Sequence, residues 1–131
     1  MGLISRKLQF IGRRGKAKVE TLFDTGSNHC LIRASVAAKL AEADELPEPK
    51  RYEAAVGSFT ARHFVVADVV LGGKRLTTLF KIVPELTEEA ILGADFLQSW
   101  HIRLDPRKKR VILDPKALRL KAVGAYHLPR R

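Results

Sequence analysis

An acidic residue lies between two apolar runs in the segment ETLFDTGSNHCLI, residues 20–32. Asp24 directly follows Leu22-Phe23, and it is followed by Thr25-Gly26-Ser27, a combination that breaks a strand. A chain with this pattern must end a buried strand on a carboxylate, turn sharply and then return to the interior. The segment therefore predicts a strand–loop–strand unit with an acid at its bend.

Each residue of this loop suits a carboxylate held in a fixed position. Asp24, at the end of a buried strand, is expected to be partly desolvated. The branched Cβ of Thr25 stiffens the loop, and Gly26 allows a sharp turn and a close approach of backbone to the carboxylate. Ser27 is expected to donate a hydrogen bond to the outer oxygen of Asp24. Asp-Thr-Gly by itself also fits an ordinary turn.

The remaining pattern is that of a mainly β domain. Alternation in KAKVETLF predicts a strand with Ala17, Val19 and Thr21 on one face. Hairpin turns are expected at four places, namely GRRGK (12–16), Gly57-Ser58, Gly72-Gly73 and Asp105-Pro106.

Two short helical segments are expected. In the first, Ser35 is the candidate N-cap, Val36, Leu40 and Ala43 recur at helical spacing, and PEPK (47–50) ends the helix. The second is ADFLQSWH, which predicts one to three turns that bring Phe96, Leu97 and Trp100 to one side.

Two motifs together give the chain a family resemblance. LFDTGSNHCLI is similar to the catalytic loop of the retropepsin-like aspartic proteases, which include the retroviral proteases and their cellular and bacterial relatives. AILGADFLQSW (90–100) resembles the second hallmark of that family, in which a hydrophobic pair and Gly93 pass behind the catalytic loop and lead into a helix. The resemblance covers about residues 3–114.

The chain departs from the viral members at two positions. Ala94 follows the glycine where viral members commonly have arginine, and Asn28 stands where many of them have an acid. The viral ion pair from that arginine therefore cannot be carried over. The sequence is closer to the cellular and bacterial branch of the family.

The resemblance implies a single-domain closed β-barrel with one or two short helices. We expect one domain over residues 1–131, with a core at about 3–114 and a basic tail at 115–131. The implied activity is that of an aspartic endopeptidase, which activates water between two carboxylates, one ionised and one protonated.

This chain has a single Asp-Thr-Gly and no Asp-Ser-Gly. The economical source of the second carboxylate is a second copy, so a two-fold homodimer is expected in which Asp24 of each subunit meets its counterpart. Thr25 would then bond across the axis to the partner's loop. A monomer would hold one unpaired carboxylate and should be inactive.

The resemblance also implies a lid and a substrate pocket. The flap candidate is AAVGSFTAR (54–62), in which Gly57 and Ser58 give the tip freedom and Val56 and Phe59 cover apolar groups of a peptide. The alternative is an ordinary surface hairpin. Leu22 and Ile91 are candidate pocket walls that also fit a plain core, and core is the better reading for Ile32.

Charge leaves a second function open. The formal net charge is +10, with Arg and Lys clustered at 6–18, 103–110 and 116–131. Such a surface suits nucleic acid, but it is also common as a solvated face. No nucleic-acid motif accompanies the charge, and aromatic residues are only 7% of the chain. We therefore regard nucleic acid as an unlikely partner, and keep a non-catalytic dimeric binding module of the same fold as a further alternative.

No metal or cofactor is expected. His29 and Cys30 are adjacent, and neighbouring side chains on a strand point to opposite faces. LGGK (71–74) lacks the spacing of a phosphate-binding loop. Cys30 is the single cysteine, the N-terminus is charged too early for a signal peptide, and no apolar run approaches the ~20 residues of a membrane span. A cytoplasmic protein is the simplest expectation.

Overall fold

The structure is a computed structural model that describes residues 3–118 of the 131-residue chain. Its elements in chain order are β1 (Ile4–Ile11), β2 (Lys16–Phe23), β3 (Leu31–Arg33), α1 (Ala34–Leu40), β4 (Asp44–Ala54), β5 (Gly57–Leu71), β6 (Lys74–Val83), β7 (Ala90–Leu92), α2 (Ala94–Ser99), β8 (Arg103–Asp105) and β9 (Arg110–Ile112). A further helical turn covers residues 115–118. The expected mainly β class is confirmed.

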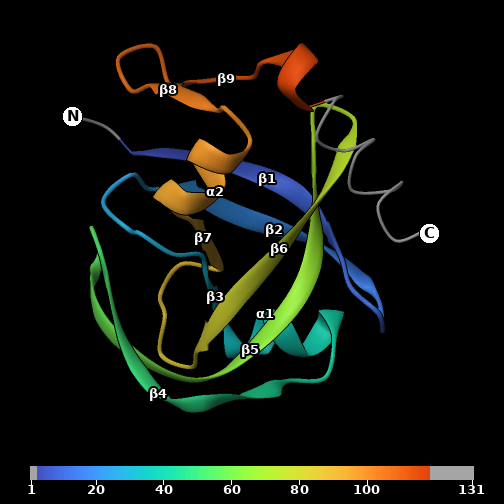
Figure 1. The fold of residues 1–131 in the computed structure, drawn as a ribbon, viewed down its shortest axis with the longest axis vertical. Helices are drawn as coiled ribbons and strands as arrows, with labels where there is room; N and C mark the ends of the chain where they lie inside the picture. The colour runs from blue at the N-terminus through green and yellow to red at the C-terminus, as the bar shows by residue number, and fades with distance from the viewer. Residues whose placement is uncertain (1–2, 119–131) are drawn as a thin grey trace.

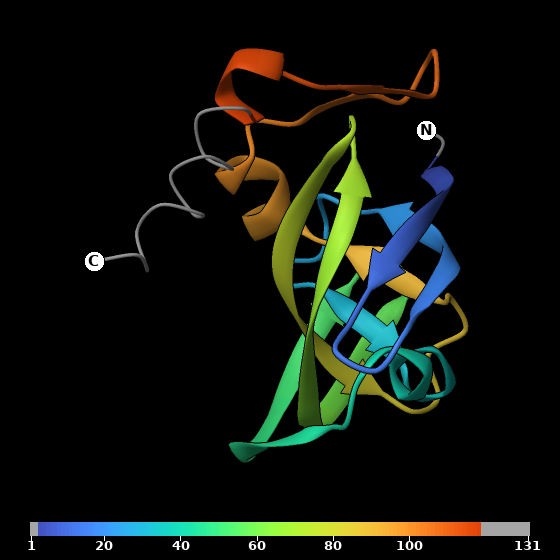
Figure 2. The same cartoon turned by 90° about the vertical axis from the view of Figure 1, so that its right-hand side faces the viewer.

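Strands β1, β2, β7, β3, β6 and β5 pair in that order, and pairing of β1 with β5 closes them into a barrel of six strands (Figures 1 and 2). β4 extends the sheet beyond β5 and lies outside the barrel. β7 lies between β2 and β3 and is parallel to β2. The first residues of the motif AILGADFLQSW, which form β7, therefore lie between β2 and β3, the two strands on either side of the Asp24 loop.

Three predicted hairpins are confirmed. β1 and β2 pair antiparallel around residues 12–15, and β8 and β9 pair around residues 106–109. β5 and β6 meet at Gly72 and Gly73, whose φ angles are +59° and +76°. Two successive positive φ angles match the twist of the flanking strands, and glycine adopts them without steric cost.

The first predicted helix is shorter than expected. α1 ends at Leu40, its N-cap is Arg33 rather than Ser35, and Ala43 lies beyond it. PEPK, expected to terminate the helix, lies instead within β4. The β4–β5 register shifts between Glu45 and Lys50, so the two prolines occupy an interruption of the ladder where no amide donor is needed.

The second helix agrees with the prediction. α2 spans Ala94–Ser99, and Phe96 and Leu97 are buried while Trp100 packs against the core from just beyond its end. α2 lies next to the β8–β9 hairpin (Figure 1). Within the described part of the chain, no helix has both the length and the apolar character that crossing a membrane requires.

The main core fills the barrel. Phe10 of β1 and Phe80 of β6 are fully buried, and their ring centroids lie 5.3 Å apart. The β1–β2 turn packs on the end of α1, because the Arg14 N–H donates to the Leu40 carbonyl at 2.9 Å. A Cβ on Gly12 would lie 2.2 Å from that same carbonyl oxygen, so this contact requires glycine.

A second, smaller apolar cluster lies under the β4–β5 hairpin. Its buried members come from the barrel and from the hairpin itself: Leu22, Leu31, Tyr52, Ala61, Val83, Leu86 and Ile91. Leu46, Ala54 and Phe59 pack against it with partial burial. The hairpin is therefore folded down on the barrel and contributes side chains to this cluster.

Truncation of Phe10 should strongly destabilise the barrel. Phe10→Ala removes a fully buried ring that faces Phe80, and such changes lower the free energy of unfolding by about 3–5 kcal/mol. The measurement is urea unfolding at one fixed protein concentration. Leu79→Ala is the control, because Leu79 is 41% exposed and should change stability by only about 0.5 kcal/mol. Equal midpoints for the two variants would contradict this account of the core.

Candidate active site

Asp24 stands at the end of β2, where the sequence pattern placed it. Its backbone N–H donates to the Leu92 carbonyl at 3.0 Å, which continues the β2–β7 pairing by one bond. The residue is 2% exposed. The expected carboxylate at the end of a buried strand is therefore present.

Both carboxylate oxygens of Asp24 accept hydrogen bonds from backbone amides. The Gly26 N–H donates to Oδ1 at 2.8 Å, and the Ala55 N–H donates to Oδ2 at 2.9 Å. A Cβ on Gly26 would lie 3.1 Å from Oδ1, which shows how closely the loop backbone surrounds the carboxylate. Thr25 and Gly26 are exposed on the surface of the protomer, beside the buried acid.

Ser27 has a different role from the one expected. Its hydroxyl donates to the His29 carbonyl at 2.6 Å, not to Asp24. Ser27 is buried, and its own N–H donates to the Asp24 carbonyl at 3.1 Å. The hydroxyl therefore closes the turn of the loop, and the outer carboxylate oxygen takes its donor from the β4–β5 hairpin.

The segment after β7 donates hydrogen bonds to the backbone of the Asp24 loop. The Ala94 N–H donates to the Ser27 carbonyl at 2.6 Å, and the Asp95 N–H donates to the Asn28 carbonyl at 3.2 Å. A Cβ on Gly93 would lie 2.4 Å from the His29 carbonyl oxygen and 2.6 Å from that of Ser27. Glycine is therefore required at residue 93 so that the two motifs can touch.

The flap candidate is the hairpin of β4 and β5, and its tip is nearer the N-terminus than predicted. Ala54 pairs with Gly57, so the turn consists of Ala55 and Val56, whereas Gly57 and Ser58 already belong to β5. Gly57 has a φ of +143°, a region that is nearly restricted to glycine. Gly57 thus provides the unusual backbone conformation at the start of β5, directly after the turn, and is not one of the two central turn residues. The end of β4 rises beside the loop that follows β2 (Figure 1).

The predicted pocket walls lie in the small cluster under this hairpin. Leu22 is 5% exposed and Ile91 is fully buried, and Phe59 packs against the same cluster. Val56 at the tip is 37% exposed. Ile32 belongs to the main core, as the sequence favoured. The structure thus brings Leu22, Ile91 and Phe59 together and leaves Val56, Gly57 and Ser58 exposed at the hairpin end.

A side-chain pair joins the loop after Asp24 to α2. His29 Nδ1 lies 3.4 Å from Asp95 Oδ2, so each partner is one residue further along the chain than Asn28 and Ala94. The His29 ring meets Tyr52 of β4 edge-on with centroids 5.1 Å apart. Lys81 Nζ lies 5.3 Å from the centroid of the Tyr52 ring. These contacts therefore connect the Asp24 loop to α2 and to β4 through residues that no motif of the sequence indicated.

Cys30 is buried behind the loop. Burial raises the pKa of the Cys30 thiol to about 12, so the reactive thiolate is scarce at neutral pH. Cys30 is therefore a structural residue. Within residues 3–118, His, Cys, Asp and Glu side chains form no cluster of three that could hold a metal ion.

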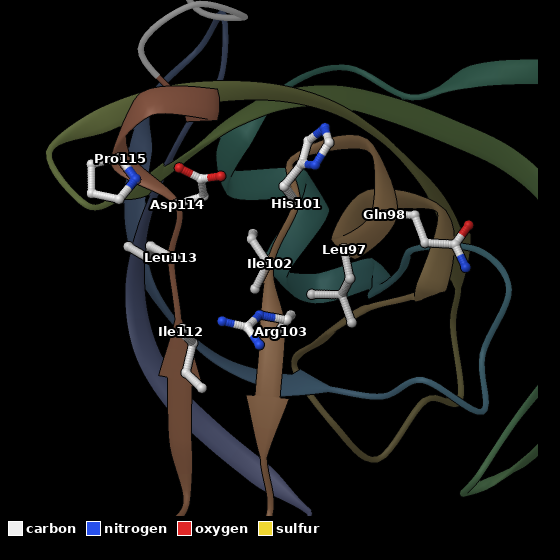
Figure 3. A pocket seen from close by; sticks show the side chains of 9 residues that line it. All are labelled: Leu97, Gln98, His101, Ile102, Arg103, Ile112, Leu113, Asp114 and Pro115. Carbon is white, nitrogen blue, oxygen red and sulfur yellow. The ribbon is translucent and has the colours of Figure 1, made fainter.

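Two cavities lie away from the Asp24 carboxylate. One of about 560 Å³ lies beside the loop and is lined by Asn28, His29, Leu46, Pro47, Glu48, Lys50, Arg51, Tyr52, Glu53, Leu79 and Lys81. The other, of about 480 Å³, lies between α2 and the β8–β9 hairpin (Figure 3) and contains none of the predicted site residues. We assign the second cavity no part in the chemistry of Asp24, because neither Asp24 nor any other residue of its loop lines it.

A sequence model of the family described as "gag-polyprotein putative aspartyl protease" matches residues 13–99. The chain belongs to this family. The match contains both the Asp24 loop and the Gly93 motif, so it supports the retropepsin-like resemblance on the residues that suggested it. No curated protein sequence matches the chain significantly.

A solved structure supports the same fold. The retroviral protease-like domain of Ddi1 from Leishmania major is similar to this chain with a TM-score of 0.56 and 15% sequence identity. The alignment covers 87% of this chain and 86% of that one. The retropepsin-like barrel is therefore confirmed for this aspartyl protease family member, and the fold is all that a likeness at this identity shows.

Adding a methyl group at Gly93 should disrupt the loop. Gly93→Ala would place a Cβ against the carbonyls of Ser27 and His29, and overpacking of this kind costs about 1–3 kcal/mol of stability. The measurement is the thermal midpoint together with the amide chemical shifts of residues 24–29. Gln98→Ala on the exposed side of α2 is the control. Unchanged loop shifts in Gly93→Ala would refute the close approach.

Proposed function

We propose that this protein is an aspartic endopeptidase that works as a homodimer. The observation that carries the proposal is the buried carboxylate of Asp24, held by backbone amides on an Asp-Thr-Gly loop within a retropepsin-like barrel. The sequence contains one such loop. Two carboxylates are needed, so the second is Asp24 of the partner subunit.

The reaction follows from one shared proton. Ionised Asp24 of one subunit accepts a proton from water while the water oxygen bonds to the scissile carbonyl carbon, and protonated Asp24 of the partner subunit donates its proton to the carbonyl oxygen. Proton transfer to the amide nitrogen then allows the C–N bond to break and releases an acid and an amine. The protons balance over the cycle, and no metal or cofactor takes part.

Thr25 and Gly26 support the dimer in this proposal. Both are exposed in the protomer while their neighbour Asp24 is buried. An exposed hydroxyl beside the catalytic acid is available to the equivalent loop of a second copy. Thr25 is therefore our candidate for the bond across the two-fold axis.

The substrate class follows from the small apolar cluster. Leu22 and Ile91 lie beside the Asp24 loop on neighbouring strands, with Phe59 of the flap packed against the same cluster. We propose that extended peptides with apolar side chains around the cut bind there under the flap, where Val56 of the tip and Gly57 and Ser58 at the start of β5 are exposed toward them. A non-catalytic binding module of the same fold would use this surface without needing Asp24.

Replacing the catalytic carboxylate should abolish cleavage. Asp24→Asn keeps the shape of the side chain but cannot share the proton, so cleavage should fall by at least about 10³-fold. The assay incubates a diverse peptide mixture between about pH 4 and 7, because acid–base catalysis depends on pH, and identifies the cuts by mass spectrometry. Asp68→Asn is the matched control, since Asp68 lies on β5 and bonds Arg75 and Thr77.

Two results of this assay would count against the proposal. One is cleavage that persists in Asp24→Asn. The other is a wild type that cuts nothing at concentrations where sedimentation shows a dimer, which would favour the binding module. The dimer requirement is tested by dilution, because specific activity should fall as the dimer dissociates.

A further inference from the structure

We infer that the β4–β5 hairpin is a self-blocking latch, in which the Ala55 amide occupies the outer oxygen of Asp24 and excludes water and substrate until it is displaced. The inference concerns the regulation of the site and rests on the proposed function for its biological meaning. It is carried by contacts at the tip of the hairpin, along its arms and at its base.

At the tip, the hairpin completes the hydrogen bonding of the carboxylate. Ala55 N lies 2.9 Å from Asp24 Oδ2, and Oδ1 is already bonded to the Gly26 amide. Hydrogen bonds to an ionised oxygen are stronger than those between neutral groups. Asp24 is 2% exposed with this contact in place. A water that is to be activated by Oδ2 must therefore take the position that the Ala55 N–H now fills.

Along its arms, the hairpin covers the apolar surface that a peptide would use. Tyr52 and Ala61 come from β4 and β5 and are 7% and 0% exposed. They share one cluster with Leu22 and Ile91 of the barrel. The protein's own side chains therefore fill the site in the closed form. An incoming peptide must exchange its apolar side chains for these.

The base of the hairpin contains the point where it can bend. The β4–β5 ladder runs from Lys50 to Ala54 on the β4 side and is interrupted between Glu45 and Lys50. A break of this kind bends a strand and weakens its pairing locally. The outer part of the hairpin can therefore move while Asp44 and Glu45 keep their pairing with β5.

A closed latch lowers the apparent affinity for every substrate. If only a fraction of molecules is open, the observed dissociation constant rises by the inverse of that fraction. Substrates that supply better apolar contacts than the flap then open the site, and weaker peptides are excluded. The latch thus closes the site and also selects among peptides by the strength of their apolar contacts.

Proline at the tip should remove the latch and leave the turn intact. Ala55→Pro deletes the N–H group that donates to Asp24. Ala55 is not one of the residues with a positive φ, so the sign of that angle does not exclude proline. Proline is favoured at the first central position of common turns. Ala55 lies between the paired residues Ala54 and Gly57, outside the ladder. Ala55→Ser is the matched control because it retains the N–H.

The first readout is alkylation of Asp24 by 1,2-epoxy-3-(4-nitrophenoxy)propane. A carboxylate oxygen attacks an epoxide carbon, the C–O bond of the ring breaks, and the alkoxide takes a proton from water. Peptide mapping follows the ester on Asp24 relative to exposed Asp44. Ala55→Pro should be labelled at least about tenfold faster than wild type, a factor that corresponds to about 1.4 kcal/mol, and Ala55→Ser should match wild type. Equal rates for Ala55→Pro and wild type would overturn the latch.

The second readout needs no proline and decides the matter if Ala55→Pro fails to fold. Hydrogen exchange of the Ala55 amide is measured by NMR in wild type and in Asp24→Ala. Protection in wild type and its loss in Asp24→Ala are expected, and equal exchange in both would refute the contact. Neither readout requires cleavage. The latch can therefore stand if the peptidase assay fails, and it can fail if that assay succeeds.

Discussion

A carboxylate removed from water needs a hydrogen-bond donor for each oxygen, and the surroundings of Asp24 are arranged around this need. β2 brings the acid to the interior, and the Leu92 carbonyl fixes the point at which the strand ends. The Gly26 amide satisfies one oxygen from within the loop, and the Ala55 amide satisfies the other from the hairpin. The position of the β4–β5 hairpin is thus part of what makes the burial of Asp24 tolerable.

The same need for hydrogen-bond partners explains why the segment after β7 requires glycine at residue 93. A loop that presents its amides to a carboxylate leaves its carbonyls facing the other way, and those carbonyls also need donors. The amides of Ala94 and Asp95 supply them. They can approach because Gly93 has no side chain to place between itself and the loop. Two motifs that are far apart in sequence are therefore two halves of one hydrogen-bonded unit.

Local signals were enough to predict much of this architecture. The buried strand before Asp24, the Gly72-Gly73 turn and the helix after Gly93 all follow from side-chain type and spacing, and the structure contains each of them. The end of the first helix and the strand character of residues 44–50 could not be predicted, because the break in the β4–β5 ladder that accommodates the prolines is a tertiary feature. The Ala55 contact has no sequence signal at all, since every residue except proline has an amide N–H. The His29–Asp95 pair was missed for a related reason, as it joins segments whose proximity only the fold creates.

The prolines of β4 also bear on how copies of this chain can meet. β4 is the outermost strand of the sheet, and an unpaired sheet edge is a template on which other chains can add a strand and aggregate. Pro47 and Pro49 remove two amide donors from that edge, and the irregular register next to them keeps it from being flat. Uncontrolled growth of fibres along this edge is thereby disfavoured. A movable hairpin, which would otherwise be a hazard in a crowded cell, can thus be kept without inviting aggregation.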